Sequence, residues 1–275
     1  MTFIKKINTG FIISIFLYPV SALSDYLFTA PPRETPQKGE EIYKPIADYL
    51  SSSTGEKFIY KHPSNWTEYS RGIQKNEYDL VFDGPHFVSW RIEHTQHNVL
   101  SKLPQLHIWR VVTKNNNEDI RRLDDLVGKK ICAPKSPNFG MLTIMSHYSN
   151  PAKEPVHVIT KGWKDGFDSV VLGKCVAAIM PKTNHKKFDP LLEKTRSIHT
   201  HLPYPNQAFT ASSSVPPHLQ SKIRQQLLSN EGQAAMAKLR DRFARGANLV
   251  NAENEEYEGI SMMLSRAENF KSAIK

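Results

Sequence analysis

Cysteine is scarce in this chain, which has only Cys132 and Cys175 among its 275 residues. No cysteine–histidine cluster has the spacing of a zinc site, and neither Gly-x-Ser-x-Gly nor His-Glu-x-x-His occurs. The chain therefore lacks the sequence signatures of zinc modules, of hydrolases with a serine nucleophile elbow and of zinc proteases. We therefore expect no enzymatic activity, no cofactor and no metal site.

The two cysteines fall at different places in the expected secondary structure. Cys132 lies late in the expected strand Lys129–Ala133, and Cys175 comes just before another, Val176–Met180. If these strands are parallel neighbours, the two sulfur atoms lie near opposite ends, beyond the reach of a disulfide. The sequence thus favours two buried free thiols, although an oxidising compartment would invite a bridge.

Long apolar runs are lacking after the N-terminal region, so no later segment is expected to span a bilayer. The run 11–20 is itself shorter than the ~20 residues of a membrane helix. Two lysines precede it and small residues follow it. This layout predicts a secretory signal peptide over residues 1–24, with cleavage after Ala22 or Ser24, and a mature protein in the periplasm.

The charge of the chain is moderately basic, with a formal net charge of +9. Such a surface suits an anionic ligand or an anionic membrane. The lysines and arginines are dispersed along the sequence, and the chain carries an export signal. We therefore do not expect nucleic acid as a partner.

The first part of the mature chain follows a β-α-β-α-β order. Pro31-Pro32 ends the first strand and Gly55 ends the first helix. This order is typical of a parallel sheet covered by helices. The expected elements are a strand at Tyr26–Ala30, a helix through Ile42–Leu50, a strand at Lys57–Lys61, a helix at Trp66–Gln74 and a strand at Tyr78–Phe82.

A second alternating set follows, joined to the first by two extended segments near 108–113 and 197–211. We expect an α/β fold of two lobes, each a mostly parallel sheet flanked by helices, with two crossover strands. Residues 25–108 would form the first lobe and 109–203 the second, and 204–275 would return to the first lobe with the C-terminal helices. Elements of the second set are expected at 123–128, 129–133, 139–148, 156–160, 167–172 and 176–180.

Two strand-to-helix junctions are candidate parts of a ligand site, because ligands of such sheets bind outside the carboxyl ends of the strands. Gly84 permits close backbone approach, and Pro85 suits a first helical turn whose free N–H groups attract anions. A plain tight turn is the alternative. Ser136 and Asn138 mark the second junction, where they could cradle an anion or simply cap a helix.

Four segments occur in the order seen in one family. They are Pro63–Trp66, YDLVFDGPHFVSW at 78–90, LDDLVGKK at 123–130 and FDSVVLGK at 167–174. On these segments the chain resembles the phosphonate/phosphite/phosphate-type periplasmic solute-binding proteins of ABC transporters, over essentially the whole mature chain. The resemblance implies the type II periplasmic-binding fold, a small solute between the lobes and an inner-membrane ABC permease as partner.

The resemblance also suggests which residues bind the solute. Members commonly place an aromatic residue where this chain has Trp66, and another where His107 or Trp109 falls. The loop that grips the oxyanion here contains Pro137 and Phe139, which offer it fewer donors. The expected solute is a phosphonate-like anion or a diverged aromatic or zwitterionic compound. The candidate ligand-binding residues are Trp66, Gly84, Pro85, His86, Trp109, Ser136, Asn138 and Trp163, with Arg33 and Lys164 as further polar candidates.

Two alternative functions stay open. The same fold could serve a ligand-sensing protein that signals to a membrane kinase, since a fold does not fix a function. The second alternative is a metal-binding periplasmic protein. His199 and His201 would project from one strand face, and His94 and His97 could share a helix face. In each case we expect a monomer.

Overall fold

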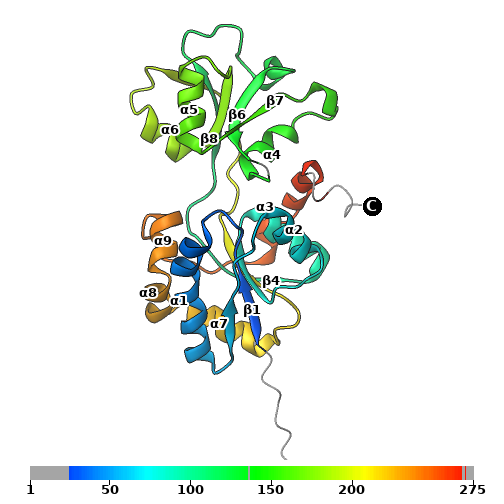
Figure 1. The fold of residues 1–275 in the computed structure, drawn as a ribbon, viewed down its shortest axis with the longest axis vertical. Coiled ribbons are helices and arrows are strands. Elements are labelled where there is room, and N and C mark those ends of the chain that lie inside the picture. The colour runs from blue at the N-terminus through cyan, green and yellow to red at the C-terminus, as the bar shows by residue number, and fades with distance from the viewer. Residues whose placement is uncertain (1–24, 136, 268–269, 271–275) are drawn as a thin grey trace, which may run out of the picture.

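The computed structural model describes residues 25–135, 137–267 and 270, so the predicted signal peptide and Ser136 lie outside the described residues. Two five-stranded mixed sheets, each flanked by helices, form two lobes stacked along the long axis of the molecule (Figure 1). The two-lobed α/β fold expected from the sequence is confirmed. No helix in the described ranges is both long and apolar enough to cross a membrane.

The sheet of the first lobe has the strand order β2-β1-β3-β10-β4. Its first three strands in the chain run parallel, and β10 is antiparallel to both β3 and β4. The strands are β1 (Tyr26–Thr29), β2 (Phe58–Tyr60), β3 (Leu80–Asp83), β4 (Asn98–Lys102) and β10 (Ala208–Ala211). The helices are α1 (Pro36–Thr54), α2 (Trp66–Gln74), α3 (Pro85–Thr95), α7 (Pro217–Leu228), α8 (Asn230–Ala235) and α9 (Ala237–Ala244).

The sheet of the second lobe has the order β7-β6-β8-β5-β9. Strands β6, β7 and β8 are parallel, and β5 is antiparallel to β8 and β9. The strands are β5 (Trp109–Lys114), β6 (Lys130–Pro134), β7 (Val156–Thr160), β8 (Ala177–Pro181) and β9 (Thr195–Thr200). The helices are η1 (Leu123–Leu126), α4 (Phe139–Met145), η2 (Pro151–Lys153), α5 (Trp163–Val171) and α6 (Lys182–Phe188).

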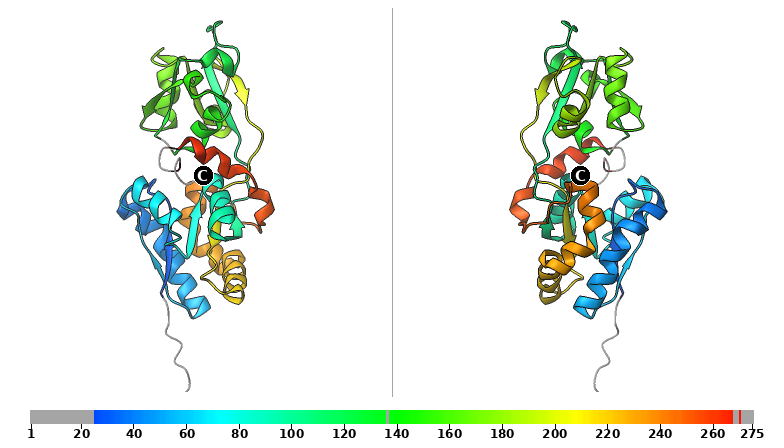
Figure 2. Two further views of the ribbon diagram at one scale, coloured as in Figure 1. Left: turned by 90° about the vertical axis from the view of Figure 1, so that its right-hand side faces the viewer. Right: turned by 90° about the vertical axis from the view of Figure 1, so that its left-hand side faces the viewer.

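Two chain segments connect the lobes, 103–108 between β4 and β5 and 201–207 between β9 and β10. They pair with each other: His107 and Tyr204 form an antiparallel bridge with backbone hydrogen bonds of 2.8 and 2.9 Å. The two segments run side by side between the sheets in Figures 1 and 2. A paired connection of this kind suits a hinge, because both chains must bend together.

The C-terminal segment contacts both lobes rather than only the first. It contains the 3-10 helices η3 (Asn254–Tyr257) and η4 (Ile260–Arg266). In η4, the backbone N–H of Ser261 donates to the Ser89 hydroxyl of α3 at 2.9 Å, and Arg266 donates to the carbonyl oxygen of Tyr148, which follows α4, at 2.8 Å. Figure 2 shows this segment, in red, lying between the lobes.

The expectation of two free thiols is wrong, because Cys132 and Cys175 form a disulfide with a Cα–Cα distance of 5.9 Å. Cys175 does not continue strand β8 in line. It lies in the turn after α5, where its N–H bonds to the Ser169 carbonyl and the next residue, Val176, bonds to Lys130 at the start of β6. The turn carries the Cys175 sulfur over the face of β6 and within reach of Cys132.

Candidate functional site

Strand β3 passes into helix α3 at the junction expected from the sequence. β3 ends at Asp83, Gly84 is extended (φ −76°, ψ 158°), and Pro85 is the first helical residue. The carbonyl oxygen of Gly84 accepts hydrogen bonds from the N–H groups of Phe87 and Val88, each at 3.0 Å. The junction is therefore a helix N-terminus at the carboxyl edge of a sheet, where the helix dipole favours an anion.

A buried ion pair anchors this junction. Oδ2 of Asp83 lies 2.8 Å from Nη1 of Arg91, and it also accepts a hydrogen bond from the Tyr69 hydroxyl. Nη2 of Arg91 lies 2.9 Å from the same hydroxyl oxygen. All three side chains are fully buried. Removing either charge would strand the other in the core, so this network fixes helix α3 on strand β3.

His86 reaches from the first lobe to the second. Its Nε2 lies 3.2 Å from the carbonyl oxygen of Pro137, and its ring stacks on Phe139 with centroids 5.0 Å apart and 7° between the planes. Burial, reinforced by the charge of Arg33, lowers the pKa of His86 to about 3 against the hydrogen bond to Pro137, which raises it. The imidazole is therefore neutral at physiological pH.

Arg33 supplies the positive charge at this edge. It lies in the loop after β1, and its Nη1 donates to the side-chain oxygen of the buried Gln207. Its Nη2 is 3.5 Å from the point that a Cβ on Gly84 would occupy. Within the described ranges Arg33 forms no ion pair, whereas the adjacent Glu34 pairs with Arg242 at 2.8 Å. An uncompensated guanidinium therefore lies beside the N-terminus of α3.

The second lobe contributes aromatic rings. The Trp109 ring stacks on His107 at 5.7 Å, is tilted against Trp163 at 5.3 Å and meets the edge of Phe139 at 6.2 Å. A Cβ on Gly140 would lie 2.5 Å from Cε3 of Trp109, so this packing requires a glycine. We call the six rings His86, His107, Trp109, Phe139, Trp163 and Tyr204 the aromatic cluster.

The other candidates lie around this cluster. Trp66 begins α2 and stacks on Phe87 at 6.3 Å, one residue along from His86. The Asn138 side-chain oxygen accepts a hydrogen bond from the Met141 N–H at 3.1 Å. Asn138 therefore caps helix α4, which was the alternative to an anion-binding role. The structure thus brings His86 and Trp109 against Phe139, with Trp163 packed on Trp109 and Trp66 packed on Phe87. Ser136 lies outside the described residues.

Two buried polar atoms of the aromatic cluster have no hydrogen-bond partner among the described residues, Nδ1 of His86 and Nε1 of Trp109. Their side chains are 2% and 4% exposed. Buried polar atoms are nearly always paired, and an orphan is costly. Both rings pack against Phe139, so these two atoms are candidates for contacts with polar groups of a ligand.

Sequence reasoning gave Arg33 no special weight, although a signal was present. The residue follows strand β1, and β1 is a parallel neighbour of β3, so both loops reach the same edge of the sheet. Lys164, considered equally plausible, is instead engaged with Asp168 at 2.6 Å on the exposed side of α5. Phe139 was noted only for the hydroxyl it lacks, whereas its ring organises the cluster.

The histidines proposed for metal binding are arranged otherwise. Helix α3 ends at Thr95, and His97 is buried with its ring nitrogens near Asn76 and Thr210. The ring centroids of His199 and His201 lie 4.3 Å apart, and both residues line a cavity of about 500 Å³ on the second lobe. In the part of the chain that the structure describes, no three histidine, cysteine or acidic side chains are grouped so that they could hold a metal.

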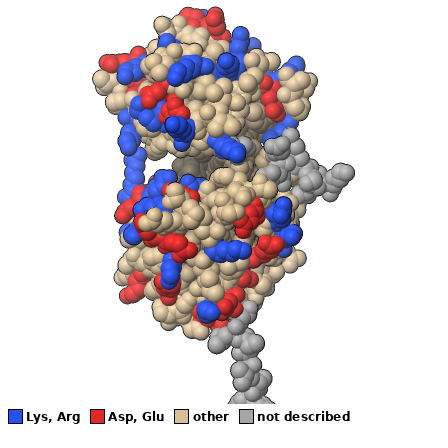
Figure 3. All heavy atoms as spheres, viewed as in Figure 1, with Lys and Arg blue, Asp and Glu red and all other residues tan. Residues whose placement is uncertain are grey.

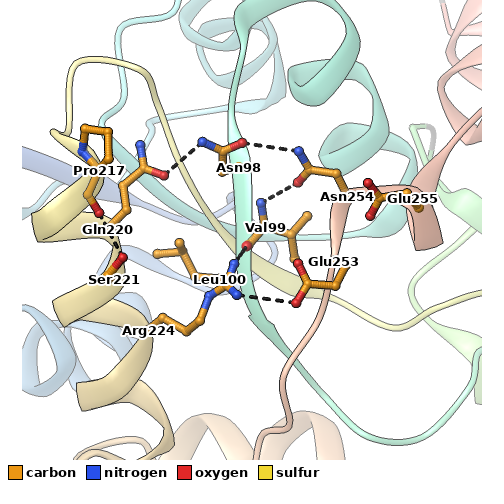
Figure 4. A pocket seen from close by; sticks show the side chains of 10 residues that line it. All are labelled: Asn98, Val99, Leu100, Pro217, Gln220, Ser221, Arg224, Glu253, Asn254 and Glu255. Atoms are coloured by element: carbon orange, nitrogen blue, oxygen red, sulfur yellow. Dashed lines mark hydrogen bonds and ion pairs between the residues drawn. The ribbon is translucent and has the colours of Figure 1, made fainter.

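A second cavity, of about 350 Å³, lies on the outer side of the first lobe between β4, α7 and η3 (Figure 4). Its polar side chains bond to one another: Asn98 joins Gln220 and Asn254, and Arg224 joins Glu253. This network ties the C-terminal segment to the edge strand. Figure 3, by contrast, shows a hollow between the two lobes with lysine and arginine side chains on both of its sides.

Solved structures share this fold at low sequence identity. XAC2383 from Xanthomonas citri bound to ATP matches with a TM-score of 0.70 and 12% identity, over 92% of this chain and all of that one. PhnD1 from Prochlorococcus marinus in complex with methylphosphonate matches with a TM-score of 0.60 and 14% identity, over 89% and 98%. A phosphonate-transporter binding protein from Pseudomonas aeruginosa matches with a TM-score of 0.58 and 10% identity, over 85% and 83%.

Among curated proteins, no sequence matches the chain. A family model does match, over residues 28–257, and it describes the phosphonate periplasmic substrate-binding proteins of ABC transporters. The match begins within strand β1 and includes the other strands of both sheets, the two connecting segments and the aromatic cluster. The chain belongs to this family, and it is a periplasmic solute-binding protein of the phosphonate type.

Proposed function

We propose that this protein binds a small phosphorus oxyanion between its lobes and delivers it to an inner-membrane ABC permease. The observation that carries the proposal is Arg33, a guanidinium with no counter-ion among the described residues, beside the N-terminus of α3 at Gly84. A cation beside the positive end of a helix dipole favours an anion. Export by the signal peptide over 1–24 and action as a monomer belong to the same proposal.

The first lobe would hold the anion and the second would cover it. Arg33 and the α3 N-terminus supply charge, while Trp109, Trp163 and Phe139 exclude water and strengthen each polar contact. His86 already contacts the second lobe at Pro137. A solute held between these walls would stabilise the closed arrangement, and opening would bend the paired segments 103–108 and 201–207.

The ligands of two similar structures support this solute class. PhnD1 is in complex with methylphosphonate and XAC2383 is bound to ATP. Both ligands present tetrahedral phosphorus oxyanions. The cleft residues proposed for this chain are those named from the sequence, Trp66, Gly84, Pro85, His86, Trp109, Ser136, Asn138 and Trp163, to which we add Arg33.

A thermal-unfolding screen tests the proposal. Methylphosphonate, phosphite, phosphate and ATP are added to the mature protein, and a true solute at a hundredfold excess over its Kd should add about 2.7 kcal/mol of stability. Arg33→Gln should remove that shift, and its unliganded melting temperature is measured in parallel because the variant also loses the hydrogen bond from Arg33 to Gln207. A melting temperature unmoved by all four compounds would contradict the proposal.

A further inference from the structure

One atom of the proposed site constrains the protonation state of its solute. Nδ1 of His86 is buried without a partner in the described ranges and lies 3.2 Å from the point that a Cβ on Gly84 would occupy. Nη2 of Arg33 lies 3.5 Å from the same point. Both atoms therefore face the point beside Gly84 that a side chain would fill, and the inference drawn from them rests on the proposed function.

The hydrogen bond on the other side of the ring fixes the tautomer of His86. The Pro137 carbonyl oxygen can only accept, so Nε2, 3.2 Å away, carries the proton. Burial and the nearby Arg33 hold the ring neutral, with a pKa of about 3. Nδ1 is then a bare lone pair. It can accept a hydrogen bond and cannot donate one.

The charged and titratable groups that face His86 are Arg33, His107 and Arg91. Arg91 is neutralised by Asp83, and burial first, then Arg33, lowers the pKa of His107 to about 4. No carboxylate is among these facing groups. Arg33 therefore attracts an anion to this point, while the lone pair of His86 repels any ligand oxygen that lacks a hydrogen.

We propose that the site selects an oxyanion that carries its own O–H or N–H, such as a hydrogen phosphonate, and that His86 Nδ1 accepts this hydrogen. A hydrogen phosphonate has one O–H donor and further oxygens that only accept. Nδ1 of His86 matches the donor. The guanidinium of Arg33 offers hydrogen bonds to the other oxygens.

Sulfur analogues separate protonated from unprotonated anions without a change of shape. Methylphosphonate is compared with methanesulfonate, and phosphate with sulfate, by titration calorimetry on the mature protein near pH 6. Sulfonate and sulfate carry no proton at this pH and would place a lone pair against Nδ1. An acceptor left buried and unpaired should weaken binding of each sulfur analogue by about ten- to a hundredfold.

The pH dependence gives a second measurement on the unaltered protein. Because the ring of His86 stays neutral, the dependence should follow the second pKa of the ligand, measured by phosphorus NMR in the same buffer. Above that pKa the protonated fraction falls, so the Kd of methylphosphonate should rise about tenfold per pH unit. A Kd that stays flat, or that falls with rising pH, overturns the inference.

His86→Phe is the matched variant, because phenylalanine keeps a ring against Phe139 and removes both nitrogens. In this variant the preference for methylphosphonate over methanesulfonate should shrink to within about threefold. His218→Phe, on the exposed start of α7, is the control and should keep the full preference. Each preference is a ratio within one protein, so a general loss of affinity does not hide the result.

The outcomes separate the two proposals. Equal binding of methanesulfonate and methylphosphonate by the wild-type protein would overturn the role of His86 and leave anion binding intact. Binding of neither member of either pair would overturn both proposals. A phosphonate preference that depends on His86 supports both.

Discussion

The wall of the first lobe is built from a helix N-terminus, the Arg33 guanidinium and a buried ion pair, whereas the wall of the second is built from aromatic rings beside Phe139. In the proposed site the first wall would offer charge and direction to a solute, and the second would cover it. The polar groups lie at the junction of β3 and α3, whereas the second lobe contributes mainly apolar surface, whose removal from water favours closure.

Loss of the buried ion pair should lower the stability of the protein more than any other change to the first wall. Asp83→Asn leaves the Arg91 charge in the core without its carboxylate, and we expect the free energy of unfolding to fall by about 3–5 kcal/mol. Urea unfolding followed by circular dichroism measures the loss. Asp48→Asn, which removes an exposed carboxylate paired with Lys44, is the control and should cost less than about 1 kcal/mol. Equal losses for the two variants would contradict the anchoring role of Asp83.

The disulfide between Cys132 and Cys175 belongs to the second lobe alone and closes a separation of 43 residues. Cys132→Ala combined with Cys175→Ala should lower stability by about 2–4 kcal/mol. Hydrogen exchange read by mass spectrometry should show lost protection in β6, α5 and β8, with β1 and β3 unchanged. Lost protection spread equally over both lobes would argue against two separately stabilised walls.

Two glycines compare the walls directly. Gly140→Ala forces a methyl group to within 2.5 Å of the Trp109 ring, so we expect a loss of about 1–3 kcal/mol of stability. Gly84→Ala needs no backbone strain at φ −76°, and its methyl group would lie 3.0 Å from Cε1 of His86, so the ring must shift slightly. It should weaken methylphosphonate binding by about tenfold or more and cost less stability than Gly140→Ala. A larger loss of stability for Gly84→Ala, together with a larger loss of binding for Gly140→Ala, would contradict the assignment of Gly84 to the ligand site and of Gly140 to packing.

Trp66 should show the smallest effect, since it is only half-buried and packs on Phe87. Trp66→Ala is expected to reduce the ligand-induced rise in melting temperature while costing about 1 kcal/mol of stability without ligand. Thermal unfolding with and without methylphosphonate checks both values. An undiminished ligand-induced rise would place Trp66 outside the binding surface.

Much of the fold was predictable because the alternation of strands and helices depends on local pattern. The apolar run Tyr78–Phe82 predicted strand β3, and the turn at Gly84-Pro85 predicted the start of helix α3. The disulfide was not predictable from strand register, because the turn before β8 leaves the line of the strand. Likewise, the contact of η4 with both lobes arises from tertiary packing that periodicity does not encode.

The candidate site was predictable only in part, for a related reason. Gly84 and Pro85 could be selected from the sequence as turn residues between a strand and a helix, and Trp109 as an aromatic residue. Arg33 lies in a loop without a motif. Its proposed role follows from the absence of an ion-pair partner for it among the described residues. The orphan Nδ1 of His86 depends on a hydrogen bond to Pro137 in the other lobe. Such properties exist only once two distant segments meet.

Titration calorimetry of methylphosphonate against three proteins tests the central claim most directly. The wild type and Arg71→Gln, which removes an exposed arginine from the last turn of α2, should bind alike. Arg33→Gln should bind about ten- to a hundredfold more weakly, since a hydrogen bond to a charged group contributes about 1.5–3 kcal/mol. Equal affinity for Arg33→Gln and the wild type would contradict an anion site at the junction of β3 and α3.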